Sequence, residues 1–332
     1  MRVKVEVNMM DATKLTKIET IECQRRGVPD DVFVCCASFE DRCLGSLRLF
    51  SDSYRFRQGY LIMYDHPSQK RQRNLEEMKR MLDPRGRYEM LESSHDSPVP
   101  SIARLAEKIA SLNLDAENSK LSVDITTLTK RHLLLLLRTI DDLGLWQALR
   151  LFYTEPKDYV TDLYVPMSLG IKGIAAVPGF SSAQLLNKPI LLAIFLGYEG
   201  DRAMALFQNL DPNETILIVP RPTYHAEWEG RTEEMNRSLI SLLGEEYIEY
   251  AHSRSPLEVA FALDTLFKKK YHLADWNCLI SPLGTKPQAV GLYLFWRAHR
   301  GEFSIIYAQP LLHNERYYST GVGTTWQLGL RD

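Results

Sequence analysis

The chain carries most of its recognisable motifs twice, in the same order. An apolar run, a Ser/Thr-rich loop ending in Thr-Lys and an apolar helical pattern make up residues 121–134, and the same succession makes up residues 276–290. Three other motifs recur: 38–42 as 197–202, 73–78 as 230–235, and Tyr153-Thr154-Glu155-Pro156 as Tyr307-Ala308-Gln309-Pro310. The offset is nearly constant, at about 155–160 residues. This period is far longer than that of a solenoid repeat, so the sequence predicts an internal duplication of one domain.

The composition allows two domains and indicates no membrane segment. A chain of 332 residues has room for two domains of ordinary size. Its formal charge of −2 gives no general attraction to nucleic acid or acidic membranes. The apolar stretches are too short to span a bilayer, and residues 2–7 alternate like a strand rather than a signal peptide. We therefore expect a cytoplasmic protein with no membrane partner.

Strand patterns alternate with helix patterns in both halves. In the first half we expect strands at 32–37, 60–64, 121–125 and 149–153, and helices at 44–50, 68–82, 98–112 and 133–140. In the second half we expect strands at 190–196, 215–219, 277–281 and 303–307, and helices at 201–210, 231–243, 256–268 and 287–298. The alternation predicts an α/β fold of two tandem Rossmann-like domains with mostly parallel sheets. Residues 178–188 have the composition of a connector, which divides the chain into domains 1–180 and 185–332.

The first candidate site is the loop after the first strand of each half. Asp41 and Arg42 recur there as Asp201 and Arg202. Ligands of open α/β sheets bind at the carboxyl ends of the strands, and an Arg in the first helical turn can reach a phosphate. The alternative is structural, with the Asp capping a helix and forming a local pair with the Arg.

The second candidate site is the Thr-Lys loop. It comprises Thr127, Thr129 and Lys130 in the first half, and Gly284, Thr285 and Lys286 in the second. Hydroxyls, free helix amides and an ammonium group at a helix N-terminus suit an anion. A positively charged Lys at a helix N-terminus interacts unfavourably with the helix dipole, so its presence in both halves indicates a negatively charged partner. The alternative is a plain capped turn.

The strand, Thr-Lys loop and helix resemble the signature of CARF domains, the CRISPR-associated Rossmann folds that sense cyclic oligoadenylates. The resemblance implies two domains paired about a two-fold axis, with the ligand lying across the pair. It implies contacts from the two Thr-Lys loops, although the first copy lacks the glycine. No effector segment is visible, so a separate effector protein is implied, and a homodimer is compatible with the sequence. The Glu-Asp-Arg loop is also similar to the first loop of TIR-type domains, which can cleave NAD.

Three functions from different classes remain open. The first is a sensor that binds a nucleotide or cyclic oligonucleotide, in the setting of prokaryotic antiviral defence. The second is an enzyme acting on a nucleotide, NAD or a nucleoside, with Glu40 or Glu199 as acid or nucleophile; Glu155, which the second copy replaces by Gln309, is a further catalytic candidate. The third is a structural subunit. The sequence leans against an enzyme, and it shows no metal-ligand spacing and no cofactor motif.

Overall fold

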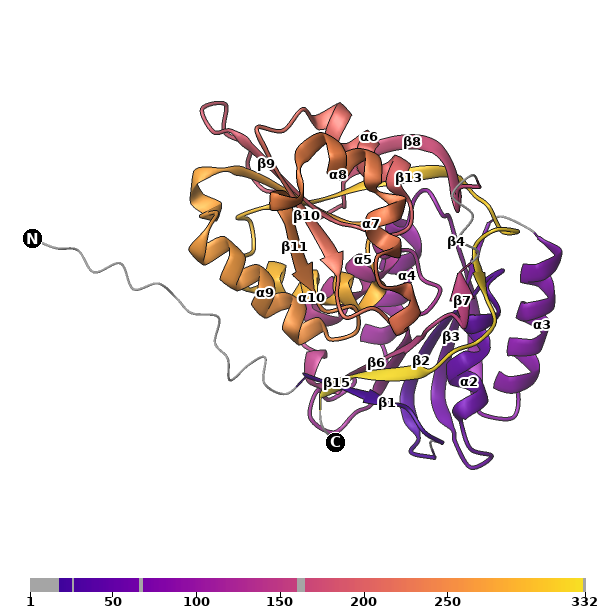
Figure 1. The fold of residues 1–332 in the computed structure, drawn as a ribbon. Helices are drawn as coiled ribbons and strands as arrows, with labels where there is room; N and C mark the ends of the chain where they lie inside the picture. The colour runs from indigo at the N-terminus through magenta and orange to yellow at the C-terminus, as the bar shows by residue number, and fades with distance from the viewer. Residues whose placement is uncertain (1–17, 26, 66–67, 160–164, 331–332) are drawn as a thin grey trace, which may run out of the picture.

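The computed structural model describes residues 18–25, 27–65, 68–159 and 165–330, and it contains two mostly parallel β-sheets flanked by helices (Figure 1). The strand predicted at residues 2–7 lies outside the described residues. The first sheet has seven strands in the order β1-β15-β6-β5-β2-β3-β4. Their bounds are β1 Ile18–Glu22, β2 Asp30–Ala37, β3 Phe56–Tyr64, β4 Arg87–Ser93, β5 Leu121–Asp124, β6 Leu149–Thr154 and β15 Thr325–Leu330.

The second sheet has six strands in the order β11-β10-β9-β12-β13-β8. Their bounds are β8 Ser168–Ala176, β9 Ile190–Phe195, β10 Glu214–Pro220, β11 Ile248–Ala251, β12 Asn277–Pro282 and β13 Ser304–His313. The helices are α2 Gly45–Leu49, α3 Gln69–Leu82, α4 Val99–Ala110, α5 Lys130–Asp142, α6 Gly200–Leu210, α7 Arg231–Met235, α8 Arg237–Leu243, α9 Pro256–Lys269 and α10 Lys286–Ala298.

The two halves share one topology. In each, five parallel strands run in the order third, second, first, fourth, fifth: β4-β3-β2-β5-β6 and β11-β10-β9-β12-β13. The predicted pair of Rossmann-like sheets is therefore confirmed. The sequence patterns indicated only four of these five parallel strands in each half, because β4 and β11 are edge strands. Most of their side chains are not buried, so they do not form an apolar run.

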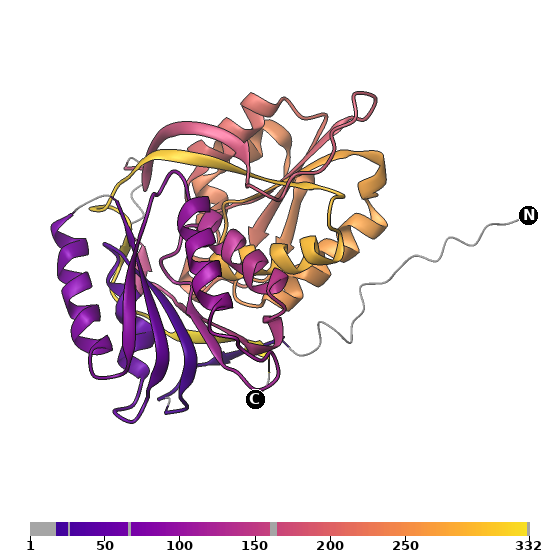
Figure 2. The same cartoon turned by 180° about the vertical axis from the view of Figure 1, so that it is seen from behind.

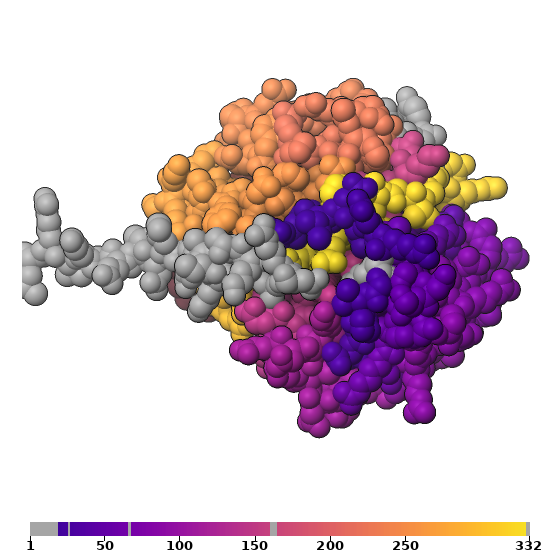
Figure 3. Space-filling model, turned by 90° about the horizontal axis from the view of Figure 1, so that it is seen from below, coloured from indigo at the N-terminus to yellow at the C-terminus, as the bar shows by residue number. Residues whose placement is uncertain are grey.

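Each half also gives a strand to the sheet of the other half. After β6 the chain crosses to the second sheet, where β8 pairs antiparallel with β13. After β13 it crosses back, and β15 pairs antiparallel with β6 and β1. The two crossing segments each contain a short strand, β7 (Asp158–Tyr159) in the first and β14 (Ser319–Thr320) in the second, and these two strands pair with one another. Figure 3 shows the indigo N-terminal segment beside the yellow C-terminal residues, across the boundary between the halves.

This exchange was not predicted. The chain changes sheets between the end of β6 at Thr154 and the start of β8 at Ser168, upstream of the proposed connector at 178–188. The division into 1–180 and 185–332 stays a prediction, with β8 and β15 seated in the sheets of the opposite halves. A smaller correction concerns the helix predicted at 231–243. It is broken into α7 and α8 at Asn236, whose side chain donates to the carbonyls of Gly197 and Thr232.

Helices α5 and α10 pack side by side between the halves (Figure 2). At their N-terminal ends, Lys130 Nζ donates to the Leu283 carbonyl at 3.0 Å. At their C-terminal ends, Arg297 Nε lies 2.9 Å from Asp141 Oδ2, which Arg300 and Tyr293 also contact. The two helices therefore point in the same direction. Among the described residues, no helix is long and apolar enough to cross a membrane.

Because β15 lies in the sheet of the first half, we expect a leucine near the C-terminal end of the chain to contribute strongly to the stability of the fold. Leu328 on β15 is 1% exposed within the core, whereas Leu312 on β13 is 58% exposed. Leu328→Ala should lower the free energy of unfolding by about 2–5 kcal/mol, the usual cost of truncating a buried leucine. Leu312→Ala is the matched control and should change it by less than about 0.5 kcal/mol. Urea unfolding measures both; equal effects would contradict the placement of β15.

Candidate functional site

Two cavities lie between the sheets, and residues of both halves line each of them. The larger encloses about 710 Å³ and the smaller about 550 Å³, in both cases counting space open to solvent. Lys130, Glu199, Lys286 and Tyr318 line both, so the cavities meet at the two lysines. The carboxyl ends of the parallel strands of both sheets thus face one shared cleft.

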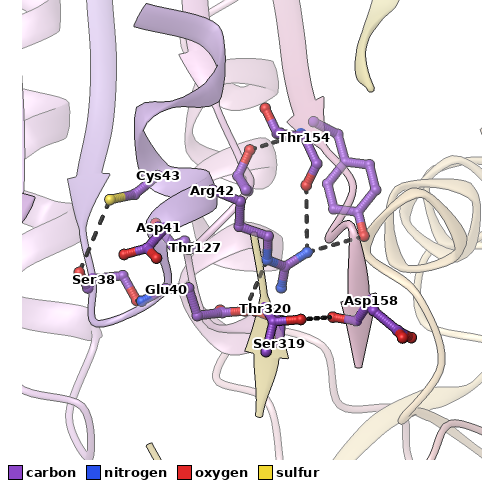
Figure 4. Close-up of polar contacts among 12 residues, drawn as sticks. Ser38, Glu40, Asp41, Arg42, Cys43, Thr127, Thr154, Asp158, Ser319 and Thr320 are labelled. Carbon is purple, nitrogen blue, oxygen red and sulfur yellow. Dashed lines mark hydrogen bonds and ion pairs between the residues drawn. The ribbon is translucent and has the colours of Figure 1, made fainter. Parts of the chain in front are cut away.

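The Glu-Arg part of the first motif forms the same buried ion pair in both halves, and Figure 4 shows the pair of the first half. Arg42 Nε donates to Glu40 Oε2 at 2.8 Å, and Arg202 Nη1 donates to Glu199 Oε2 at 2.6 Å. Each arginine also reaches the end of the last parallel strand, through the carbonyls of Thr154 and Ala308. The motif therefore recurs because it ties the first loop to the fifth strand. The arginine pairs with Glu and not, as the structural alternative proposed, with Asp.

The tails of the opposite halves complete these ion pairs. The Ser319 hydroxyl of β14 donates to Glu40, and the Ser168 hydroxyl of β8 hydrogen-bonds to Glu199. Burial acts to raise the pKa of Glu199, but Arg202, Ser168 and other neighbours lower it to about 2. Burial also acts to raise the pKa of Glu40, but Arg42 and Lys286 lower it below its ordinary value. Both glutamates are therefore ionised at neutral pH.

The two aspartates of the motif lie outside the shared cavities. Asp41 accepts from Arg73 at 2.7 Å and from Asn74 at 3.2 Å. Asp201 is exposed and lines a separate polar hollow on the side of α6, with Arg237 on its wall. Neither carboxylate caps a helix: Glu40 and Glu199 occupy the N-cap positions, and neither makes a side-chain capping bond.

A buried asparagine repeats in both halves and was missed in the sequence. Asn74 Nδ2 donates to the Ser38 carbonyl at 3.0 Å, and Asn236 Nδ2 donates to the Gly197 carbonyl at 2.8 Å. Each holds the loop after the first strand of its half. The comparison of 73–78 with 230–235 had placed Asn74 opposite Arg231. The shared hydrogen bond corrects that register by five residues.

The threonines of the Thr-Lys loops hold backbone groups. Thr129 and Thr285 are the N-caps of α5 and α10 and accept from the backbone amides of His132 and Gln288, each at 3.2 Å. Thr285 and Gln288 form a reciprocal capping box, while Thr127 donates to the Cys36 carbonyl at 2.7 Å. The capped-turn alternative is correct for these hydroxyls, and Gly284 lets the loop approach the Leu196 carbonyl.

The lysines behave differently, because neither has a carboxylate partner within ion-pair distance among the described residues. Burial and the nearby Arg202 and Lys286 hold the pKa of Lys130 well below its ordinary value. Burial and the nearby Arg42 lower the pKa of Lys286 to about 8. Both ammonium groups sit where the N-termini of parallel helices converge, so the helix dipoles add to the positive potential. Across both cavities, five basic side chains face two carboxylates: Arg42, Arg71, Lys130, Arg202 and Lys286 against Glu40 and Glu199.

Glu155 and its counterpart Gln309 make contacts between the halves. Glu155 is bound by the guanidinium of Arg254, with Nε 2.5 Å from Oε1 and Nη2 3.3 Å from Oε2. Gln309 accepts from Arg131 and donates to Asp96. Asp96 and Arg254 follow the third strands of their halves and so occupy equivalent positions. The Glu155–Arg254 ion pair on one side therefore corresponds to the Gln309–Asp96 hydrogen bond on the other. Glu155 lines neither shared cavity.

Aromatic rings line the larger cavity. Tyr153 and Tyr198 belong to recurring motifs, whereas no motif in the sequence indicated Tyr159, Tyr224 or Trp228. Tyr159 lies 5.1 Å from Tyr198 and 5.6 Å from Trp228 between ring centroids, and Tyr224 lies 6.0 Å from Tyr153. The rings come from β6, β7 and the loops of the second half, so only the folded chain collects them. Over the described ranges, no group of three or more His, Cys, Asp or Glu side chains could hold a metal ion.

The lowered pKa of Lys286 predicts how stability changes with pH. The unfolded chain keeps this lysine protonated up to its ordinary pKa of 10.5, while the folded protein carries the charge at a cost below about pH 8. Lys286→Met should therefore be more stable than the wild type at pH 7. The advantage, at most about 3 kcal/mol, should shrink as the pH rises from about 8 to 10.

Urea unfolding at pH 7 and pH 9.5 measures this difference. Lys269→Met, at an exposed lysine on α9, is the matched control and should show no such pH-dependent gap. A Lys286→Met variant whose stability difference from wild type stays constant across this pH range would contradict the prediction.

The capping role of Thr285 gives a separate prediction. Thr285→Ala should lower the free energy of unfolding by about 0.5–2 kcal/mol, because α10 loses its N-cap acceptor. Thr285→Ser keeps the hydroxyl and should retain most of that stability. Thermal melting of the three proteins tests this expectation, and equal losses in Ala and Ser would show that the methyl group, not the cap, matters.

Comparisons with known proteins do not assign a family. No family model matches the chain, and no curated protein matches it. A solved Type III CRISPR defence DNA nuclease activated by cyclic oligoadenylate aligns with 84% of this chain and 65% of its own, at 13% identity and a TM-score of 0.46. A putative universal stress protein from Pseudomonas aeruginosa UCBPP-PA14 aligns with 85% of this chain and 94% of its own, at 12% identity and a TM-score of 0.26. The chain thus spans just under two thirds of the nuclease, and TM-scores below 0.5 establish neither family nor function.

Proposed function

We propose that this protein is a nucleotide sensor that binds a phosphate-bearing ligand, with cyclic oligonucleotides as one candidate class, in the cleft between its sheets. The observation that carries the proposal is the convergence of Lys130 and Lys286 at the N-termini of two parallel helices. Their lowered pKa values mean that the unliganded protein holds these charges at a cost. A phosphate would remove that cost, because it accepts charge-assisted hydrogen bonds from both.

The aromatic lining supports a nucleotide rather than a bare anion. Tyr159, Tyr198, Tyr224 and Trp228 lie on the same cavity as the two lysines. Aromatic side chains stack on bases of any sequence, and each stacked base contributes about 1–3 kcal/mol. A ligand with both a base and a phosphate would use both kinds of wall. The setting in antiviral defence, and signalling to a separate effector protein, are proposed from the resemblance of the Thr-Lys loops to CARF domains.

The second candidate function is hydrolysis of a nucleotide or NAD with Glu199 as nucleophile. Glu199 lines both cavities, and its Oε1 is buried without a hydrogen-bond partner among the described residues. A general-acid role for Glu40 or Glu199 is disfavoured, since a general acid needs a raised pKa and both values are lowered. The sensor proposal is preferred because both glutamates already serve as partners of buried arginines.

The binding prediction centres on Lys286. Lys286→Met should weaken binding of a nucleotide ligand by about ten- to a hundredfold, the scale of a charge-assisted hydrogen bond of about 1.5–3 kcal/mol. Affinity in the wild type should also fall as the pH rises above about 8, because the unliganded lysine then loses its proton. Calorimetry with mono-, di-, cyclic and oligonucleotides at pH 7 and pH 9 measures both effects.

Lys269→Met serves as control and should leave every affinity unchanged. A wild type that binds none of these nucleotides would exclude the sensor function for the ligands tested. Chromatography of the same mixtures separates the two candidate functions: intact ligand supports the sensor, and cleavage that Glu199→Gln abolishes supports the enzyme.

A further inference from the structure

Arg71 presents an unsatisfied guanidinium on the wall of the smaller cavity. The residue is only 8% exposed, and its Nε and Nη1 have no hydrogen-bond partner among the described residues. The nearest carboxylate oxygen, Glu315 Oε1, lies 3.8 Å from Nη2, which is beyond hydrogen-bond distance. Glu315 thus forms a long ion pair with Arg71 but satisfies neither of these two groups. Buried N–H groups without an acceptor are costly, so their place beside a cavity points to an anionic occupant.

The surroundings of Arg71 are rich in basic groups. Lys130 and Lys286 line the same cavity, and His313 contributes a buried Nδ1 that has no partner in the described structure. The two carboxylates on this wall, Glu40 and Glu199, are already bound by Arg42 and Arg202. Within the described part of the chain, three basic side chains therefore have no carboxylate at hydrogen-bond distance: Arg71, Lys130 and Lys286.

The opposite end of the cleft is built differently. Arg231, in the first turn of α7, pairs with Asp158 at 3.2 Å, lies 5.5 Å from the ring of Trp228 and lines neither cavity. Loop aromatics line this aromatic end, on the larger cavity: Tyr159, Tyr198, Tyr224 and Trp228. The smaller cavity has the rings of Phe39, Tyr64 and Tyr307 beside its basic groups, and among the described residues only this end has a basic side chain with unsatisfied donors. The two lysines lie between the two ends.

We infer that the Arg71 end of the cleft is a subsite for a terminal phosphate group, so that the ligand is an asymmetric nucleotide with its base at the aromatic end. This inference rests on the proposed function and names the ligand class more closely. A guanidinium donates charge-assisted hydrogen bonds to phosphate oxygens, and the Nε and Nη1 groups of Arg71 have no acceptor among the described residues. A phosphomonoester is close to a dianion at neutral pH, whereas a bridging diester carries one charge, so the monoester better matches three basic groups.

The test uses two ligands that differ only in that group: an adenine dinucleotide with and without a terminal phosphate, at the 5′ or the 3′ end. The wild type should bind one of the phosphorylated forms ten- to a hundredfold more tightly. Arg71→Gln should lose that preference while binding the unphosphorylated dinucleotide as the wild type does. Arg80→Gln, at an exposed position on the same helix, is the matched control and should keep the preference.

The outcomes separate the subsite from the proposed function. Equal affinity for all forms in the wild type, or a preference that survives in Arg71→Gln, would overturn the subsite and leave the nucleotide sensor standing. A wild type that binds none of them would overturn both. If Arg71→Gln does not fold, Arg71→Lys tests the subsite instead. This variant keeps the positive charge but replaces the several N–H donors of the guanidinium by one ammonium group, so it should retain only part of the preference for the phosphorylated dinucleotide. Full retention of that preference would overturn the subsite.

Discussion

The convergence of two positive helix ends is the constraint on which the rest of the molecule depends. Helices α5 and α10 run in the same direction and bring Lys130 and Lys286 to one place, where burial and neighbouring cations lower the pKa of both. On balance this arrangement costs stability in the unliganded fold, because the Lys130–Leu283 hydrogen bond and the nearby Glu40 and Glu199 offset the burial of the charges only in part. Its cost is offset elsewhere, most directly at the other end of the helices, where Asp141 is bound by Arg297 and Arg300. That buried contact keeps the helices side by side while their N-termini repel.

The exchange of strands prevents the two halves from separating under this repulsion. Because β8 completes the second sheet and β15 completes the first, the halves cannot move apart without breaking sheet hydrogen bonds. The same crossings carry β7 and β14 past the cleft, where Ser319 reaches Glu40. Two separate domains would have to associate to build such a site. Here one chain builds it, and each half is free to differ in sequence from the other.

The sequence predicted the duplicated fold well and the roles of individual residues less well. Buried parallel strands such as β2 and β9 are continuous apolar runs, so pattern alone located them. The exchanged strands β8 and β15 carry weaker patterns, and their partners lie more than a hundred residues away, which no local signal reports. The Glu-Arg motif was correctly singled out, but recurrence cannot distinguish a ligand contact from a buried ion pair. Arg71 was missed because its significance lies in what it lacks, and a missing partner is visible only in three dimensions.

The change from Glu155 to Gln309 illustrates how asymmetry enters a duplicated protein. In sequence, the loss of a carboxylate from one copy made Glu155, in the other copy, a candidate for acid–base chemistry. In the structure, Glu155 faces Arg254 and Gln309 faces Asp96, so each side chain matches a partner that has changed with it. A carboxylate opposite Asp96 would place two negative charges together, and the amide avoids this. The interface between the halves thus stays complementary because the residue types differ on both sides of each contact. The cleft shows the opposite behaviour: Arg71 keeps two buried N–H groups that no acceptor among the described residues satisfies. Donors left unsatisfied beside a cavity are where an external ligand is expected.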